Sequence, residues 1–377
     1  MIIRSLNVER FKCFERLDLP LASLTLLTGF NGAGKSSSLQ PLLLMAQALR
    51  EEPVALTLPL NGALVRLGSA GDVVSLKQGG AITIGFSADQ DSASWVFRHD
   101  RTLGSHGLRL LKSKFSFGET DDGVVQWSPP GVAHPLIKAI RDVIFLSGVR
   151  KFRLEAYPYP DNPSAVVGDV GCEGDHAAYW YVTRADEEVE KPRRHPSEER
   201  TTVRGQIDAW LKEIFPQAAV NAEALPGVSL AKLSFKLGRS PTWCRPSNVG
   251  YGLSYAFPLL VALICSKPGQ VIVVDSPEAH LHPRAQSTMG RILAHFAAAG
   301  LQILIESHSD HLLSGIRLAV RQRVLSPSGV AVYFFSGIRE DQEDGAPNRI
   351  EIREDGGIGS WPAGFFDQAL KDLVELS

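Results

Sequence analysis

The sequence predicts an α/β fold in which a largely parallel sheet is covered by helices on both faces. Three apolar runs predict buried strands, at Val143–Ser147, Val271–Asp275 and Gln302–Glu306. Strands that are apolar on both faces are typical of parallel sheets between layers of helices. Shorter β-like runs in the first half alternate with glycine and aspartate turns, which predicts inserted antiparallel strands and hence a mixed sheet.

Composition bounds the class of protein. The 377 residues allow two or three units, or one core with large insertions. Hydrophobic residues at 44% and charged residues at 21% are ordinary values for folded chains, so general disorder is not expected. The formal net charge of -2 excludes a uniformly basic nucleic-acid coat, although it leaves room for a local basic patch.

The cysteines and the apolar runs indicate the compartment. The four cysteines are far apart and form no CxxC pair, which argues against a disulfide framework or a cysteine-based zinc module and favours a reducing cytosol. No apolar run is long enough to cross a bilayer, and the first ten residues read as a strand rather than a signal peptide. We therefore expect a soluble, cytoplasmic protein without a membrane partner.

The N-terminal elements lead into a glycine-rich turn. Short apolar or alternating runs predict strands at Ile2–Val8, Glu15–Leu19 and Leu24–Thr28. The segment Lys35–Leu49 has apolar residues at helical spacing and no internal glycine, so it predicts a helix. Pro41 falls early in this helix and is expected to shift or kink its first turns.

The inserted segment and the charged segment follow. The inserted antiparallel strands are expected at Ala63–Leu67, Ala81–Phe86, Ser94–Phe97 and Leu108–Phe117. Residues 151–204 contain several prolines and a run of mixed charge, which favours a solvated arm. The alternative is a contact with a partner or nucleic acid, although interspersed glutamates cancel most of the positive field. The basic residues that would make it are Lys191, Arg193, Arg194, Arg200 and Arg204.

The second half returns to the αβ pattern and completes the domain assignment. Helices are expected at Gln206–Phe215, Tyr251–Ser266, Gln286–Ala299 and His311–Arg321, and final strands at Val330–Phe335 and Arg349–Ile352. We assign residues 1–150 to an N-terminal lobe with the inserted β-rich segment, 151–245 to an arm with a charged linker, 246–340 to a C-terminal lobe, and 341–377 to a tail.

A phosphate-binding motif lies at the glycine-rich turn. The segment Gly29–Ser36 (GFNGAGKS) fits GxxxxGK[ST], with a strand before it and a helix after it. In this context main-chain N–H groups and the positive helix end face phosphate oxygens. Lys35 is expected to reach the β- and γ-phosphates of ATP, and Ser36 to bind Mg²⁺. The other candidate nucleotide contacts are Asn31, Gly32, Ala33, Gly34 and Ser37. The alternative is a purely structural glycine turn.

The second half of such a site is an acid at the end of a buried strand. Asp275 ends the apolar run Val271–Asp275 and is expected to hold Mg²⁺, mostly through water. Many strands end in aspartate, so the assignment depends on the residues that flank it.

Those flanking residues carry a family resemblance. The segment Asp275–Pro283 (DSPEAHLHP) resembles the acid-strand block of AAA-type ATPases of the ABC/SMC-like superfamily, which includes the OLD and RecF-type proteins. The segment Ile305–Ser309 (IESHS) resembles the switch block, in which a histidine, here His308, faces the γ-phosphate. Leu253 and Ser254 resemble the signature, and Ser254 lies 21 residues before Asp275. The resemblance covers the whole chain and implies an ABC-ATPase head fold.

The C-terminal end also resembles one branch of this superfamily. Trp361–Gln368 (WPAGFFDQ) is similar to a tail domain of unknown function found in bacterial members. Its aromatic residues Trp361–Phe366 are expected to plug the core, the alternative being a ligand site.

Two departures from the family pattern bear on activity. The resemblance places a water-orienting glutamate directly after the strand-end aspartate, but this chain has Ser276 there, and serine is no carboxylate base. Glu278 or His308 could position the water instead, so slow hydrolysis is expected. The signature also lacks its glycines, having Tyr255 and Ala256 after the serine.

The same residues allow other interpretations. The histidine spacing is compatible with a zinc site, but the family pattern places two of the histidines, His280 and His282, at a dimer seam. The set is His280, His282, His308 and His311. Arg150 could contact nucleotide or DNA, or form a surface salt bridge. A Toprim nuclease like that of OLD proteins does not fit, because only 68 residues follow Ser309. The acidic residues among them are Asp341, Glu343 and Asp344 in a polar loop.

The resemblance implies a slowly hydrolysing ATPase. Two copies would form a nucleotide-sandwich dimer, with Ser254 of each capping the nucleotide on the other, and closure would regulate a separately encoded effector such as a nuclease in bacterial anti-phage defence. Binding of nucleic acid is a further possibility. The alternatives are a DNA-repair or DNA-end-binding ATPase of RecF type, and a nucleotide-regulated scaffold without meaningful turnover, which Ser276 favours. A transporter ATPase is less consistent with the sequence.

Overall fold

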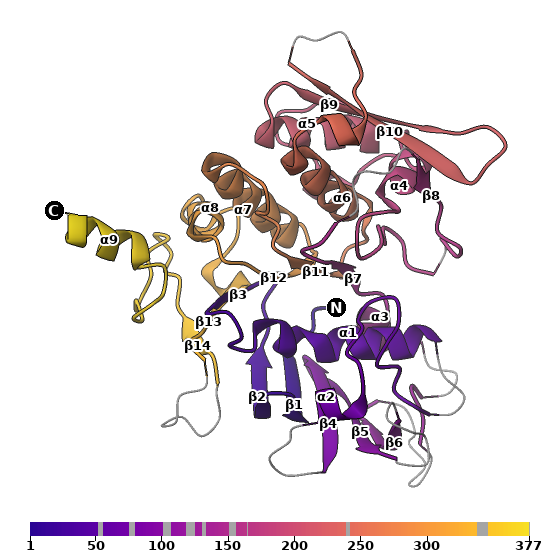
Figure 1. Ribbon diagram of the computed structural model, residues 1–377, viewed down its shortest axis with the longest axis vertical. Coiled ribbons are helices and arrows are strands. Elements are labelled where there is room, and N and C mark those ends of the chain that lie inside the picture. The colour runs from indigo at the N-terminus through magenta and orange to yellow at the C-terminus, as the bar shows by residue number, and fades with distance from the viewer. Residues whose placement is uncertain are drawn as a thin grey trace. The chain divides into compact units, whose positions relative to one another are not determined.

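A computed structural model, shown in Figure 1, describes residues 1–51, 56–74, 80–100, 107–117, 125–129, 133–150, 156–163, 165–238, 242–337 and 346–376. The chain divides into two compact units. The first unit comprises Met1–Val143, Ala331–Glu351 and Ile358–Ser377. The second unit comprises Ile144–Val330 and Ile352–Gly357. Asp341, Glu343 and Asp344 lie outside the described residues.

An antiparallel sheet in the first unit has the strand order β2-β1-β4-β5-β6. These strands are β1 (Ser5–Phe11), β2 (Phe14–Pro20), β4 (Ala81–Ala88), β5 (Asp91–His99) and β6 (Leu108–Phe115). Alternate side chains on β4 and β5 are buried, Ile84 and Trp95 among them, which gives this sheet one apolar face. Three of the four expected inserted strands are thereby confirmed.

The same unit holds the elements on both sides of the glycine-rich turn. Strand β3 (Leu24–Gly29) leads into helix α1 (Lys35–Glu51), which runs through Pro41 without ending. Helix α1 packs on β1, β3 and helix α3 (Pro135–Arg141). The strand order here is β14-β13-β3, with β13 at Val330–Phe335 and β14 at Asn348–Ile350. The remaining helices of the unit are α2 (Ala70–Val73) and α9 (Gln368–Leu376).

The strand expected at Ala63–Leu67 does not form, and this prediction was wrong. The segment makes only an isolated bridge between Asn61 and Arg66. The side chain of Gln47, buried in α1, takes the place of a strand partner, because its Oε1 accepts hydrogen bonds from the N–H groups of Leu64 (3.0 Å) and Val65 (3.3 Å). A side-chain amide has thus satisfied main-chain groups that a ladder would otherwise pair.

The second unit contains the predicted parallel strands, in the order β12-β11-β7. They are β7 (Ile144–Leu146), β11 (Val271–Asp275) and β12 (Gln302–Glu306). The register pairs Asp275 with Glu306, so the carboxyl ends of these strands lie at one edge. The helices of this layer are α5 (Val203–Ile214), α6 (Tyr251–Cys265), α7 (Pro283–Ala298) and α8 (Asp310–Arg321).

A small sheet with the order β8-β10-β9 was not anticipated. Its strands are β8 (Tyr157–Pro158), β9 (Ala218–Ala224) and β10 (Leu230–Leu237), and α5 and helix α4 (Ala177–Thr183) pack against β9. The strands are short and partly exposed, so their periodicity is weak. Figure 1 shows the β9–β10 hairpin as a long projecting ribbon. Among the described residues of this unit, short 3₁₀ turns also lie at Lys191–Arg193, Pro246–Asn248 and Pro327–Gly329.

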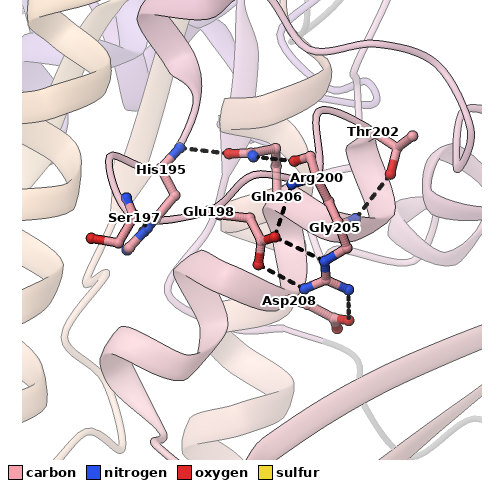
Figure 2. A network of polar contacts seen from close by, with 8 residues as sticks. All are labelled: His195, Ser197, Glu198, Arg200, Thr202, Gly205, Gln206 and Asp208. Carbon is pink, nitrogen blue, oxygen red and sulfur yellow. Dashed lines mark hydrogen bonds and ion pairs between the residues drawn. The ribbon is translucent and has the colours of Figure 1, made fainter.

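Residues 184–204 differ from the expected solvated arm, because they fold against α5 and α6. Figure 2 shows the loop at residues 195–200, just before α5. The side chain of Gln206, which lies in α5, makes hydrogen bonds to both ends of this loop. Its Oε1 accepts from the N–H of His195 (2.5 Å) and its Nε2 donates to the carbonyl of Arg200 (2.5 Å). The Arg200 guanidinium donates two hydrogen bonds to the carboxylate of Glu198, from Nε to Oε1 (2.9 Å) and from Nη2 to Oε2 (2.8 Å). These bonds lower the pKa of Glu198 to about 2.

Two further arginines of this segment bind the C-terminal end of α6. Arg193, only 6% exposed, donates to the carbonyls of Ile264 (2.8 Å) and Ser266, and Arg184 donates to that of Cys265 (2.8 Å). Cationic groups are favourable at a helix C-terminus, where carbonyls are unpaired and the dipole is negative. These charges therefore serve folding, which weakens the interpretation of the run as a nucleic-acid contact.

Within the described residues, no helix is both long enough and apolar enough to span a bilayer.

Candidate functional site

The loop between β3 and α1, here named the glycine loop (Gly29–Lys35), requires glycine at two positions. Gly29 has φ +133°, and a Cβ there would lie 2.1 Å from the main-chain oxygen of Phe335. Gly34 has φ +101°, and a Cβ there would lie 2.8 Å from Cζ of Phe14. L side chains rarely adopt these conformations. A strand–glycine loop–helix turn of this kind presents N–H groups and a positive helix end to an anion.

Lys35 places a positive charge on this loop. Its side chain is 4% exposed at the first residue of α1, and Nζ donates to the carbonyls of Gly29 (3.1 Å) and Phe30 (2.7 Å). Of the other predicted contacts, Asn31, Gly32 and Ser36 are exposed, Gly34 and Ser37 are half-buried, and Ala33 is buried. A glycine-rich turn at a helix start, a buried ammonium against it and an exposed serine at the second residue of the helix fit a metal-bound polyphosphate.

The C-terminal tail contacts the glycine loop. The rings of Phe30 and Phe334 are 5.6 Å apart, and a Cβ on Gly364 would lie 2.5 Å from Cζ of Phe30. Phe365 is fully buried, with ring centroids 5.4 Å from Phe334 and 5.2 Å from Trp361. Of the plug expected at Trp361–Phe366, only Phe365 is buried, whereas Trp361 is 50% exposed. The segment packs on Phe30, the second residue of the nucleotide motif.

The acid loop (Asp275–His282) lies in the second unit and begins with Asp275, whose carboxylate accepts two hydrogen bonds. Oδ1 of Asp275 accepts from the Ser276 hydroxyl (2.8 Å), and Oδ2 accepts from the N–H of Gly148 (3.2 Å). A Cβ on Gly148 would lie 2.8 Å from that Oδ2, so glycine is needed for the approach. Ser276 has φ +49°, and its N–H donates to the carbonyl of Glu306 (2.8 Å). Ser276 thus orients Asp275.

Glu278, also in the acid loop, has one carboxylate oxygen that accepts a hydrogen bond and one that, within the described chain, does not. Its Oε1 accepts from the main-chain N–H of His308 (3.0 Å), and burial raises the pKa of the carboxyl. Its Oε2 is buried and has no hydrogen-bond partner among the residues that the structure describes. A buried carboxylate with a raised pKa and an unused oxygen is suited to accept a proton. The side chain of His308 is exposed beside it.

The predicted signature lies at the start of α6. Ser254 is 4% exposed, and its hydroxyl has no hydrogen-bond partner in the described part of the chain. The exposed residues at this helix end are instead Gly250 and Tyr251. The ring of His280, from the acid loop, lies 5.2 Å from that of Tyr251 and 4.7 Å from that of Tyr255.

The structure gathers the predicted residues into one group in each unit. The first unit holds Asn31, Gly32, Ala33, Gly34, Lys35, Ser36 and Ser37 on one loop and helix start. The second unit brings Asp275, Ser276, Glu278 and His308 together, with Ser254 on the helix that packs beside them. Gly148 was missed as a site residue, although a glycine just after a predicted strand is a signal of close approach. Arg150 is buried, which excludes the surface salt bridge that was one interpretation of it.

Two segments of the chain match known protein families. Residues 186–314 match the family described as "AAA domain, putative AbiEii toxin, Type IV TA system". Residues 325–376 match a family of proteins of unknown function, DUF3696. A search of curated proteins found no match.

Solved structures match over almost the whole chain. An SMC head bound to the C-terminal winged-helix domain of ScpA has a TM-score of 0.50 at 11% identity, covering 98% of this chain and 100% of that one. The chain has the fold of an SMC head. An SMC head with an extended coiled coil, bound to the C-terminal domain of ScpA from Pyrococcus furiosus, has a TM-score of 0.52 at 11% identity, covering 100% and 99%. The AAA-domain match and the SMC head fold confirm the predicted fold class and the resemblance to ABC/SMC-like ATPases.

Proposed function

We propose that the chain binds ATP with Mg²⁺ and hydrolyses it slowly. The observation that carries the proposal is the glycine loop, where two glycines with positive φ and close neighbours lead into a helix that starts with buried Lys35. Lys35 would hold the β- and γ-phosphates, and Asn31, Gly32, Ala33, Gly34 and Ser37 would surround them. Ser36 and Asp275 would hold Mg²⁺, which supplies charge neutralisation to the phosphates.

Glu278 is the proposed base. A serine hydroxyl cannot accept a proton from water at neutral pH, and the Ser276 hydroxyl is already donated to Asp275. The Glu278 carboxylate has a raised pKa and one oxygen without a hydrogen bond. We assign the exposed imidazole of His308 to the γ-phosphate, as the switch histidine.

Two copies are proposed to associate around ATP through the start of α6. Because Ser254 is buried, the N–H groups at the exposed residues Gly250 and Tyr251 are better placed than the Ser254 hydroxyl to reach a second copy's phosphate. The proposed cap is therefore still the start of α6, but its main-chain N–H groups take the place of the Ser254 hydroxyl.

The proposed role is regulation of a separately encoded effector, such as a nuclease, in cytoplasmic bacterial anti-phage defence. The description of the matched family as a putative toxin of a toxin–antitoxin system supports a role of this kind. The SMC heads of similar fold are bound to a partner protein, ScpA, which supports partner binding by the proposed dimer.

A nucleotide-regulated scaffold without turnover is the second candidate. It is favoured by Ser276 at the position where the family resemblance expects glutamate. The two candidates differ in their response to Ser276→Glu. An increase in turnover would support a wild-type chain built to hold ATP, whereas no change, combined with loss of turnover in Glu278→Gln, would support Glu278 as the base.

Nucleotide binding is tested with Lys35→Ala. Hydrogen bonds to charged groups contribute about 1.5–3 kcal/mol, so the affinity for ATP·Mg²⁺ should fall about 10- to 100-fold. Equilibrium binding of a fluorescent ATP analogue measures it, with the exposed Lys212→Ala as control. Equal affinity in Lys35→Ala and wild type would remove the assignment.

Association is tested at Gly250, where a Cβ would meet no atom within 4 Å. Gly250→Asp should fold, because aspartate is a good N-cap residue, but its charge should repel an incoming phosphate. Gly250→Asn is the uncharged control. Sizing with a non-hydrolysable analogue should show ATP-dependent association in wild type and Gly250→Asn but not in Gly250→Asp. Identical behaviour of all three would contradict capping by α6.

A further inference from the structure

Arg150 lies at a junction of three segments in the second unit. Its side chain is 3% exposed, and its donors reach three main-chain carbonyls. Nε donates to Ser147 (3.2 Å), just after β7, Nη1 to Tyr255 (3.0 Å) in α6, and Nη2 to Asp275 (2.9 Å), at the end of β11. Only a planar guanidinium offers several donors in such a fixed fork.

Burying this charge is unfavourable unless its surroundings compensate. The Tyr255 ring lies under the guanidinium, with 5.1 Å from Cζ to the ring centroid. Burial lowers the pKa of Arg150 to about 10, and the fields of Asp275 and Glu278 oppose that change. Arg150 is therefore protonated at neutral pH.

The acid loop itself is held by the same helix. Ser276 and His280 have left-handed φ of +49° and +61°, conformations that persist in non-glycine residues only where surrounding contacts enforce them. The His280 ring packs on Tyr255, and a Cβ on Gly252 would lie 2.7 Å from the carbonyl oxygen of His280. A shift of the first turns of α6 would therefore move the acid loop.

We propose that Arg150 is a positioning residue that locks the first turns of α6 to Asp275, so that a contact at the exposed end of α6 sets the placement of Glu278. The inference rests on the proposed function, because it concerns hydrolysis at this loop. Arg150 touches neither nucleotide nor water in this account. It acts by keeping β7, β11 and α6 in one register.

Arg193 offers a matched control. It is also buried and also donates to main-chain carbonyls, those of Ile264 in α6 and of its C-cap residue Ser266, but at the opposite end of the helix. Removing either guanidinium takes a buried cationic donor away from this helix. Only the loss of Arg150 releases the acid loop.

The experiment compares Arg150→Gln, Arg150→Lys and Arg193→Gln in the full chain. Misplacement of a catalytic group by about 1 Å can cost about 100-fold in rate, so kcat should fall by about 100-fold in both Arg150 variants, with KM for ATP unchanged. Arg193→Gln should keep the wild-type kcat at a comparable loss of thermal stability. Hydrogen exchange should quicken at residues 276–282 and 251–255 in Arg150→Gln and not in Arg193→Gln.

The outcomes separate the two claims. Wild-type kcat in a folded Arg150→Gln, with unchanged exchange at residues 276–282, overturns the positioning role and leaves the ATPase proposal intact. Absence of any Lys35-dependent turnover in wild type overturns both. If Arg150→Gln does not fold, Tyr255→Leu replaces it. This substitution removes the ring under the guanidinium but leaves Arg150 itself in place. Unchanged kcat in Tyr255→Leu and Arg150→Lys together overturns the role equally.

Discussion

The glycine loop and the acid loop are both sharp turns after a buried strand, but they are built differently. In the glycine loop the left-handed conformations fall on Gly29, Gly32 and Gly34. In the acid loop they fall on Ser276 and His280. A left-handed conformation costs a non-glycine residue about 1–2 kcal/mol, a cost that glycine does not carry.

This difference teaches how each loop is held in shape. The glycine loop owes its form to its own residues and to main-chain packing on Phe335. The acid loop owes its form to neighbours, namely the ring of Tyr255, the carbonyl of Glu306 and the guanidinium of Arg150. Binding of nucleotide to the glycine loop of a single copy should therefore be insensitive to changes around the acid loop, whereas turnover should be sensitive to them.

The largest effect on stability is expected from Gly29→Ala. The new Cβ would overlap the carbonyl of Phe335. Overpacking of this kind lowers the free energy of unfolding by about 3 kcal/mol. Gly32→Ala is the matched control, since its φ is also positive but a Cβ would meet nothing within 4 Å. Denaturant unfolding measures both. Equal losses would show that the packing on Phe335 contributes nothing to the glycine loop.

A pH-dependent effect is expected from Glu278→Gln. The folded-state pKa of Glu278 is raised above its unfolded value, so the folded state binds this proton more tightly and wild-type stability falls as pH rises through that interval. Glutamine cannot ionise, so the variant should lose this decline and be more stable than wild type at neutral pH. Urea unfolding at mildly acidic and neutral pH checks it. The same pH slope in both proteins would argue against burial of an ionising Glu278.

The smallest effect is expected from Ser276→Gly. Glycine relieves the left-handed strain at φ +49° but gains freedom in the unfolded chain, and these terms nearly cancel at about 1 kcal/mol each. Unfolding midpoints should differ little. A large loss of stability would mean that the hydrogen bond from the Ser276 hydroxyl to Asp275, rather than the backbone, holds the acid loop.

The sequence predicted the parts of this molecule whose signals are local. The parallel strands β11 and β12 are continuous apolar runs, and the glycine loop is a contiguous motif, so their elements lie within a few residues of the prediction. The antiparallel strands β4 to β6 were found from alternation and turns.

The remainder depends on contacts between distant segments. Ala63–Leu67 has a strand-like composition, but the amide of Gln47 satisfies its main-chain groups. The charge of Arg193 suggested solvent, but its guanidinium caps a helix about 70 residues further along the chain. Ser254 is buried because it lies in a helix that is apolar on almost every face, so the serine follows the burial of α6 as a whole.

The most direct test of the account is single-turnover ATP hydrolysis by wild type, Glu278→Gln and Ser276→Ala, with ATP binding measured alongside. We predict that Glu278→Gln lowers the rate by about 10²–10⁴-fold, the contribution of a positioned base, while both variants bind ATP like wild type. Ser276→Ala should retain most of the wild-type rate. Wild-type hydrolysis in Glu278→Gln, or a comparable loss in Ser276→Ala alone, would contradict the assignment of Glu278 as the base.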